Sequence, residues 1–390
     1  MPTQTATTRL TLEAVIAQIA TKPPDVQLVA MAALYQRYPH LKTATPVYQR
    51  SPEDHALYAA CRFDVALFTR TFLSHLCPSA FSSMHEDIFE RYRADAGTRG
   101  LRDVTAAPRQ FAKTTIIGKI KVIHDCVYQH ERYIVIISSR DDLAVDKVKD
   151  VRTELEGNEA LIRVYGPQVG PTWNMDDLIT SQGVRVRAVA RGTQARGLLW
   201  GKFRPTKILP DDAENTTHVL TQAQREKTWN WFAEDISKLG DKDTNIDMIG
   251  TVLHDDGLLA KLLRNPGYRR RCYQAVLQFA DASAVPLWQH WREIFLDLDN
   301  PGHLADALAF FEAHEAAMIQ GTEVLWEAEY PYYRLMVERL VEGEASFWKD
   351  RQNQPQRAGD TLFAMDQAGY FSLSTDRLLR RDGRAVAFTQ

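Results

Sequence analysis

A lysine and two hydroxyl residues stand together in the segment AAPRQFAKTT, at residues 106–115. The spacing follows the phosphate-loop template G-x-x-x-x-G-K-[ST], but Ala107 and Ala112 replace both glycines, while Lys113 and Thr114 match. In such a loop the backbone N–H groups surround phosphate, the lysine reaches the terminal phosphates and the hydroxyl binds magnesium. Alanine enters positive φ at a cost of about 1 kcal/mol. The segment is therefore predicted to be a phosphate loop with a modified backbone path.

The sequence around this segment favours the loop over its alternative, a helix start with a solvated lysine. A strand-like run precedes it, and apolar residues recur at helical spacing after it, which is the context that the motif requires. Arg109 adds a second cation where phosphate charge would lie. The predicted nucleotide-contacting residues of the loop are Ala107, Pro108, Arg109, Gln110, Phe111, Ala112, Lys113, Thr114 and Thr115.

Paired carboxylates follow the apolar run in KILPDDAEN. We expect Asp211 to hold a magnesium ion together with Thr114, and Asp212 to orient and polarise the attacking water. Glu214 is the alternative for this second role because its longer side chain could reach the same place. An isolated pair of aspartates would more simply be a solvated turn.

Another polar group follows the apolar run in TNIDMIGTVLH, where Thr251 and His254 stand at the end of a predicted strand. Taken alone, a threonine at a strand end is usually structural. If the strands assemble into one sheet, both side chains would face the terminal phosphate and could sense its presence.

Short β-rich runs alternate with helical patterns between residues 101 and 265, which predicts an α/β fold with crossover helices. RYIVIISS is a continuous apolar run, as in a strand buried on both faces. GVRVRAVARG alternates apolar and charged residues, which would suit an edge strand. The functional groups would gather at the carboxyl ends of these strands.

The predicted domain organisation has four parts. They are a helical lead-in at 1–75, an α/β core with the predicted phosphate loop at 76–265, a helical lid at 266–365 and a tail at 366–390.

The bulk composition argues against a strongly basic, a secreted or a membrane-inserted protein. The 390 residues include 45% hydrophobic and 25% charged residues, with a formal charge of −3, so no overall basicity indicates nucleic acid. The four cysteines form no CxxC pair, and neither a signal peptide nor a long apolar segment is present. We therefore expect a cytosolic protein without membrane insertion.

Four segments together resemble the large terminase subunit of tailed bacteriophages, a family that packages viral DNA. They are PRQFAKTT, YIVIISSRDDLAVDKVKDVRTELEGN, ARGLLWGKFRPTKILPDDAEN and IGTVLHDDGLLAKLL, within about residues 70–365. The resemblance implies an ASCE-type P-loop NTPase core, whose mainly parallel central sheet is flanked by helices. Lys113 and Thr114 match the Walker A lysine and hydroxyl, and Arg109 its early arginine. Asp211 and Asp212 match the paired acids of Walker B.

The resemblance also assigns a coupling residue and an arginine that would act on a neighbouring subunit. Thr251 matches the family's coupling threonine. Arg196 resembles an upstream arginine that in some members reaches a neighbouring subunit's nucleotide, and Arg191 and Arg204 are rival candidates. Aspartate at 212, where many members have glutamate, and alanine at 112 depart from the family pattern.

The implied activity is ATP hydrolysis with Mg²⁺ that drives double-stranded DNA through a portal protein into a procapsid. The implied assembly is a ring, a pentamer when docked, with a monomer possible in isolation and with a small terminase subunit as a further partner. The protein would act in the host cell cytoplasm and would not be expected in the mature virion. The family normally continues into an RNase H-like nuclease; because the sequence ends where this domain would begin, we expect no cleavage activity.

Two other functions stay open from the sequence. One is a helicase-like DNA translocase unrelated to packaging, although no second set of motor motifs is found. The other is a nucleotide-binding assembly protein that no longer hydrolyses. The sequence gives only weak indications of which residues contact DNA. The densest basic stretches are RNPGYRRRC, with Arg269, Arg270 and Arg271, and DRLLRRDGR. Each could bind phosphates or could simply be a solvated face.

Overall fold

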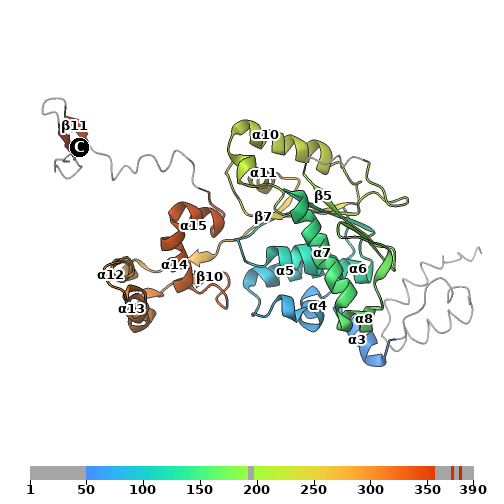
Figure 1. Ribbon diagram of the computed structural model, residues 1–390, viewed down its shortest axis with the longest axis horizontal. Coiled ribbons are helices and arrows are strands. Elements are labelled where there is room, and N and C mark those ends of the chain that lie inside the picture. Colours follow the sequence, from blue (N-terminus) through green and yellow to red (C-terminus); the bar gives the residue numbers. More distant parts are fainter. Residues whose placement is uncertain (1–49, 192–196, 356–369, 373–376, 380–390) are drawn as a thin grey trace, which may run out of the picture.

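An eight-stranded sheet forms the centre of the larger part of the molecule (Figure 1). The structure is a computed structural model that describes residues 50–191, 197–355, 370–372 and 377–379. The strand order is β3-β4-β5-β2-β6-β7-β1-β8. The bounds are β1 Arg102–Ala106, β2 Tyr133–Ser138, β3 Val169–Trp173, β4 Asp177–Thr180, β5 Arg185–Ala190, β6 Lys207–Pro210, β7 Asn245–Gly250 and β8 Arg269–Cys272.

The six strands from β5 to β8 run parallel, while β3 and β4 are antiparallel at one end. The prediction of an α/β fold with a mainly parallel sheet flanked by helices is thus confirmed. The edge position suggested for residues 184–190 is wrong, because β5 lies between β2 and β4. The alternating pattern of β5 indicates one buried and one more exposed face, and a strand inside a sheet can also have two such faces.

Helices cover both faces of the sheet (Figure 1). One face carries α3 Pro52–Cys61, α4 Val65–Phe72, α5 Ser83–Ala94, α6 Lys121–Tyr128, α7 Asp141–Gly157 and α8 Glu159–Tyr165, with a 3-10 turn at Ser74–Leu76 and a π-helical segment, η3, at Thr114–Ile120. The other face carries α10 Gln222–Trp231 and α11 Leu258–Leu263; α9 Thr216–Val219 precedes α10 and the π-helical η4 Phe232–Ile236 follows it.

Strand β2 contacts the helix layers on both faces of the sheet. Ile134 and Ile136 join the hydrophobic core of the first face, whereas Tyr133, Val135 and Ile137 join that of the second. All five are fully buried. Because each such aliphatic side chain contributes about 1.5–3 kcal/mol, this strand anchors both helix layers and fixes the sheet edge where polar residues emerge.

A smaller subdomain follows the sheet and has its own core around Trp291, Ala307, Phe311 and Met318. It contains β9 Val276–Gln278, η5 Ala282–Ala284, α12 Val285–Phe295, α13 His303–Met318, β10 Glu323–Val324, α14 Tyr332–Glu342 and α15 Glu344–Asp350. A separate hairpin pairs β11 Tyr370–Ser372 with β12 Arg377–Leu379. Although β8 belongs to the large sheet, it lies beyond residue 265, where the sequence places the end of the core.

Among the described residues, no helix combines the length and the apolar character that crossing a membrane requires.

Candidate active site

The predicted phosphate loop leaves the carboxyl end of β1 and enters η3 at Thr114. Two of its residues have left-handed backbone conformations, Gln110 with φ 64° and Ala112 with φ 53°. The second glycine position of the template thus does require positive φ, and alanine accepts it at a cost of about 1–2 kcal/mol. The π-helical turn that follows is a distortion often found at functional sites.

Asp211 is brought next to this loop although it lies almost a hundred residues away in the sequence. It directly follows β6 and is fully buried. The Thr114 hydroxyl donates a hydrogen bond of 3.1 Å to its Oδ1. A Cβ at Gly118 would lie 3.1 Å from its Oδ2, so only glycine leaves the carboxylate its full space. Burial raises the pKa of Asp211 above its ordinary value.

The side-chain oxygens of Thr114 and Asp211 form a donor set that would suit a magnesium ion. Their hydroxyl and carboxylate oxygens are hard ligands, and Mg²⁺ typically takes one or two protein oxygens while it keeps waters and substrate phosphates. Lys113, which is 6% exposed, precedes Thr114 at the mouth of η3. These residues therefore fit a magnesium-bound phosphate compound, in which the ion would neutralise phosphate charge.

The two candidate catalytic acids differ in their surroundings. Asp212 is exposed, has φ 49°, and its backbone N–H donates to the Ile249 carbonyl at 3.1 Å. Glu214 is buried, and its two carboxylate oxygens accept the N–H groups of Leu258 at 2.8 Å and Leu259 at 3.1 Å. Burial raises the pKa of Glu214. Its carboxylate thus caps the N-terminus of α11, whereas the side chain of Asp212 faces solvent.

Thr251 joins the end of β7 to the start of the loop. Its hydroxyl donates to the Ala107 carbonyl at 3.2 Å, and the Ala107 N–H donates to the Gly250 carbonyl at 3.0 Å. A displacement of the loop would therefore reach β7 directly. His254 lies apart from this junction, in its own turn, where its Nδ1 accepts the Asp256 N–H at 2.9 Å.

Residues of the smaller subdomain hold the outer part of the loop. The Arg109 N–H donates to the Asp350 carbonyl at 2.9 Å, and its Nε lies 3.3 Å from the Asp350 carboxylate. The guanidinium of Arg351 donates to the Arg109 carbonyl at 2.6 Å. In this conformation Arg109 is bound to the subdomain by its backbone and its side chain. Its N–H and that of Ala107 are not available to a phosphate.

Gln110 and Phe111 extend the same contact. The Gln110 side-chain oxygen accepts hydrogen bonds from Tyr330, at 3.0 Å, and from Arg351, at 3.2 Å. The rings of Phe111 and Tyr330 stack with centroids 4.5 Å apart. Asn353 completes the contact, since its side chain accepts the Val252 N–H at 2.9 Å. No local sequence pattern distinguishes these subdomain residues, so they could not be predicted from the sequence.

His85, at the start of α5, forms a hydrogen bond with the backbone of the loop. Its Nδ1 accepts the Ser82 N–H at 3.0 Å, so Nε2 carries the proton and donates to the Phe111 carbonyl at 3.1 Å. The bond accepted at Nδ1 requires the neutral ring, because a protonated Nδ1 cannot accept. Burial lowers the pKa of His85 from 6.5 to about 4.

This histidine predicts an acid-sensitive fold. Because the unfolded chain takes up the proton near pH 6.5 and the folded chain only near pH 4, stability is lost as the pH falls through this window. The expected loss from His85 is about 3 kcal/mol in the free energy of unfolding. Urea titrations at pH 7 and pH 4.5 would measure it.

The variant His85→Gln is the matched control for the pH effect. Glutamine can make the same two hydrogen bonds and is common at this capping position. Its unfolding should depend less steeply on pH, although His124, whose pKa burial lowers to about 3, keeps part of the dependence. An unchanged slope would show that His85 is not the titrating group.

The candidate arginines lie in different places. Arg196 is outside the described residues. Arg191 follows β5, and its Nη2 donates to Thr228 of α10 at 2.7 Å. Arg204 is exposed. Thr115 belongs to η3, and Pro108 is buried behind the loop.

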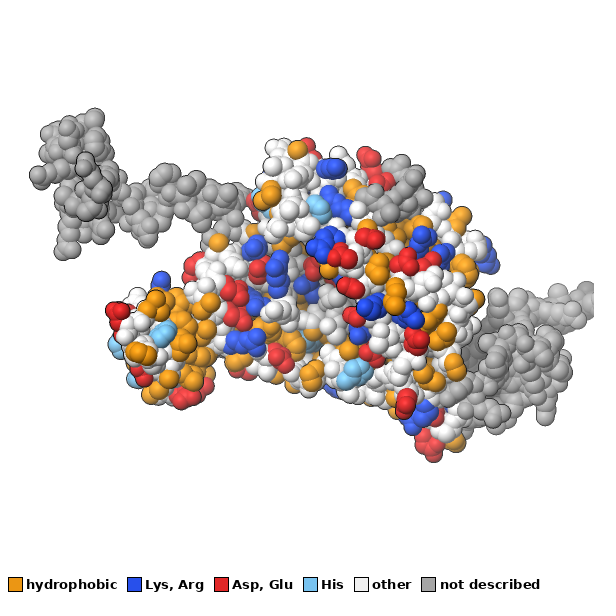
Figure 2. All heavy atoms as spheres, viewed as in Figure 1, with side chains coloured by type: hydrophobic (Ala, Val, Ile, Leu, Met, Phe, Trp, Pro, Cys, Tyr) orange, Lys and Arg blue, Asp and Glu red, His pale blue; other side chains and the backbone are white. Residues whose placement is uncertain are grey.

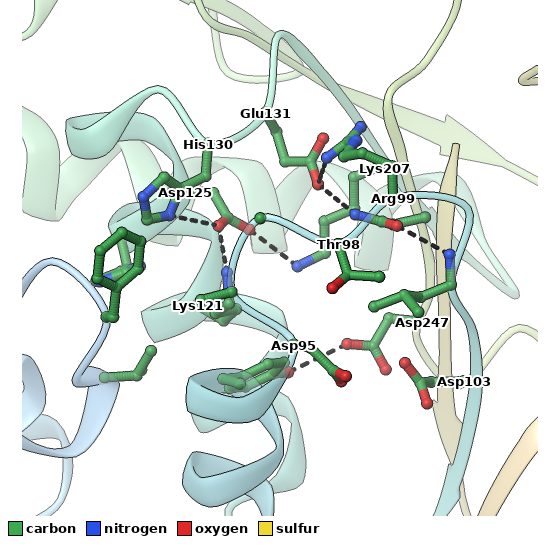
Figure 3. Close-up of a pocket in the computed structure, with 18 of the residues that line it drawn as sticks. Asp95, Thr98, Arg99, Asp103, Lys121, Asp125, His130, Glu131, Lys207 and Asp247 are labelled. Carbon is green, nitrogen blue, oxygen red and sulfur yellow. Dashed lines mark hydrogen bonds and ion pairs between the residues drawn. The ribbon is translucent and has the colours of Figure 1, made fainter. Parts of the chain in front are cut away.

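A cavity of about 300 Å³ with several charged residues in its lining is found at the opposite, amino-terminal edge of the sheet (Figure 3). Asp125 lies at its centre, paired with Lys121 and, at 3.0 Å, with Lys207. The side chains of His124, Asp125 and His130 come within 4.8 Å of one another, a spacing that a metal ion could bridge. The two ammonium groups already neutralise Asp125 and would repel a dication, so we assign no metal there.

The basic stretch at 269–271 is largely paired. Arg269 contacts Asp95 at 2.6 Å and Asp103 at 2.7 Å, and Arg271 contacts Asp87 at 2.6 Å, which leaves exposed Arg270. On the face drawn in Figure 2, Lys and Arg side chains alternate with Asp and Glu over the core, and hydrophobic side chains gather on the smaller subdomain. The stretch at 376–384 lies mainly outside the described residues.

Comparison with solved structures shows a likeness of fold to a known protein. No protein-family model and no curated protein matches the sequence. Among solved structures, the chain is similar to the crystal structure of the HK97 bacteriophage large terminase, with 17% sequence identity and a TM-score of 0.42. The similarity covers 75% of this chain and 55% of that one, so the chain spans about half of its length. At this TM-score we base no conclusion about function on the likeness.

Proposed function

We propose that this chain is the ATP-hydrolysing motor domain of a viral terminase large subunit, of the P-loop ASCE type, which moves double-stranded DNA into a procapsid. The four sequence motifs motivate this function. The observation that carries it is the hydrogen bond of 3.1 Å between Thr114 and Asp211, because it joins the hydroxyl of one motif to the acid of another. A solvated helix start and a solvated aspartate turn would have no reason to meet in a buried site.

The roles follow from the contacts. Lys113 would reach the terminal phosphates of ATP, and Thr114 and Asp211 would hold Mg²⁺. Asp212 is the better candidate for polarising the attacking water, because Glu214 is engaged by α11. Catalysis would consist mainly of positioning and charge stabilisation, with an arginine such as Arg196 supplied by a neighbouring subunit.

Thr251 would couple the site to movement. It links the Ala107 carbonyl to the end of β7, while Arg109 is held by Asp350 of the smaller subdomain. Phosphate binding that repositions the loop would therefore act on both the sheet and the subdomain. Portal protein, a small terminase subunit and a ring of five copies are the partners that this proposal requires.

The test is ATP turnover by the purified chain, measured alone, with double-stranded DNA, and with portal protein. The expected result is Mg²⁺-dependent hydrolysis that DNA or portal stimulates. Stimulation by single-stranded DNA without any effect of portal would favour the helicase-like translocase. Tight nucleotide binding without hydrolysis under all conditions would favour the assembly protein.

A further inference from the structure

Lys147 makes an unexpected contact in the candidate site. It lies in α7, where the sequence resembles that of an ordinary solvated helix face. Its ammonium nevertheless lies 2.7 Å from Asp211 Oδ2 and donates to the Asp211 backbone carbonyl at 3.0 Å. The side chain of Lys147 is only 16% exposed and that of Asp211 is fully buried.

The carboxylate of Asp211 has both of its oxygens engaged. Oδ1 accepts the Thr114 hydroxyl, and Oδ2 carries the Lys147 ion pair. The space beside Oδ2 is further limited on the η3 side, where a Cβ at Gly118 would come within 3.1 Å. The carboxylate is thus closely confined between Thr114, Gly118 and Lys147.

We propose that Lys147 is a built-in counter-cation, which occupies the positive position beside Asp211 without metal and leaves it when Mg²⁺ enters. This rests on the proposed function in so far as that function supplies Mg²⁺ with its nucleotide. A buried carboxylate without a partner is strongly destabilising, so the metal-free chain needs such a cation. An ammonium and a dication a few ångströms apart at one buried carboxylate repel each other strongly, so they exclude one another.

The exchange makes the site selective for the metal–nucleotide complex. A metal ion without nucleotide has to displace Lys147 while offering its ammonium no new negatively charged partner. A metal that arrives with phosphates brings negative charge, which offers the displaced ammonium a new partner. Lys147 therefore lowers the affinity for a free dication and reserves Asp211 for the loaded nucleotide.

The test is a Mn²⁺ titration of the full chain without nucleotide, with free Mn²⁺ followed by electron paramagnetic resonance. Lys147→Met is expected to bind Mn²⁺ at least tenfold more tightly than the wild-type chain. Lys147→Arg keeps the charge and should stay within about threefold of wild type. Lys149→Met, an exposed lysine on the same helix, is the matched control and should change nothing.

A further substitution, Asp211→Asn in the Lys147→Met chain, should abolish the gain and so place the bound Mn²⁺ at Asp211. Lys147→Gln repeats the test with a side chain that still donates hydrogen bonds, in case the methionine variant does not fold. Equal Mn²⁺ affinity of the wild-type and neutral variants would overturn the inference. Because the readout needs no ATP, a chain that shows the gain but hydrolyses no ATP even with double-stranded DNA and portal protein would refute the proposed function and leave the role of Lys147 intact.

Discussion

Replacing Lys113 by alanine is expected to lower ATP turnover by about 10²-fold or more. Lys113 is 6% exposed and lies directly before the hydroxyl that contacts Asp211. A buried ammonium at this place would stabilise the negative charge that grows on phosphate oxygens during hydrolysis, and alanine would remove that stabilisation. Steady-state phosphate release under saturating ATP and Mg²⁺ is the measurement.

Lys119→Ala is the matched control for this prediction. Lys119 lies in the same π-helical segment, but it points to Glu154, with 3.6 Å between their charged atoms. Its loss should leave turnover within a few-fold of the wild-type rate. If the isolated chain turns over too slowly, because a neighbouring subunit has to complete the site, binding of a fluorescent ATP analogue provides the readout. Unchanged binding and turnover in Lys113→Ala would exclude this loop as the phosphate site.

Asp212→Asn is expected to lower turnover by about 10²- to 10⁴-fold while nucleotide binding is retained. The amide cannot accept the proton of the attacking water. Asparagine suits the backbone, since Asp212 has φ 49° and asparagine tolerates left-handed conformations well. Single-turnover hydrolysis and equilibrium binding of ATP separate the two effects.

Glu214→Gln, in contrast, should lower the stability of the fold and leave ATP turnover nearly unchanged. Its carboxylate accepts two backbone N–H groups at the start of α11, so the neutral amide is expected to cost about 1–3 kcal/mol in the free energy of unfolding. Turnover of the folded fraction should change little. The reverse pattern, a stable Glu214→Gln chain without turnover and an active Asp212→Asn chain, would assign the catalytic acid to Glu214.

The sequence was informative where chemistry follows strand ends. Asp211 and Thr251 stand just after an apolar run, and Lys113 and Thr114 follow β1 through the loop at residues 107–112. Parallel strands bring such positions to one edge. Their predicted proximity could therefore be derived from local patterns. The positive φ of Ala112 was also foreseeable, because the loop template has glycine at that position.

The sequence was uninformative where contacts depend on distant segments. Lys147 has the pattern of a helix surface residue, and only the packing of α7 against β5 and β2 brings it to Asp211. Strand β8 consists of RRRC, which shows no apolar alternation, yet it pairs with β1. The hairpin of β3 and β4 is short and half-exposed, so its signal was too weak to distinguish from a loop.

The contacts of Arg351 with the phosphate loop have a consequence for the order in which the protein matures. They join residues 242 and 241 positions apart, from Arg351 to Arg109 and Gln110. A ribosome therefore has to extend the chain past Arg351 before these supports of the left-handed turn at Gln110 exist. During synthesis the early half can form its strands, but its phosphate loop lacks these partners. The nascent chain is thus expected to acquire its mature loop only after Arg351 has left the ribosome.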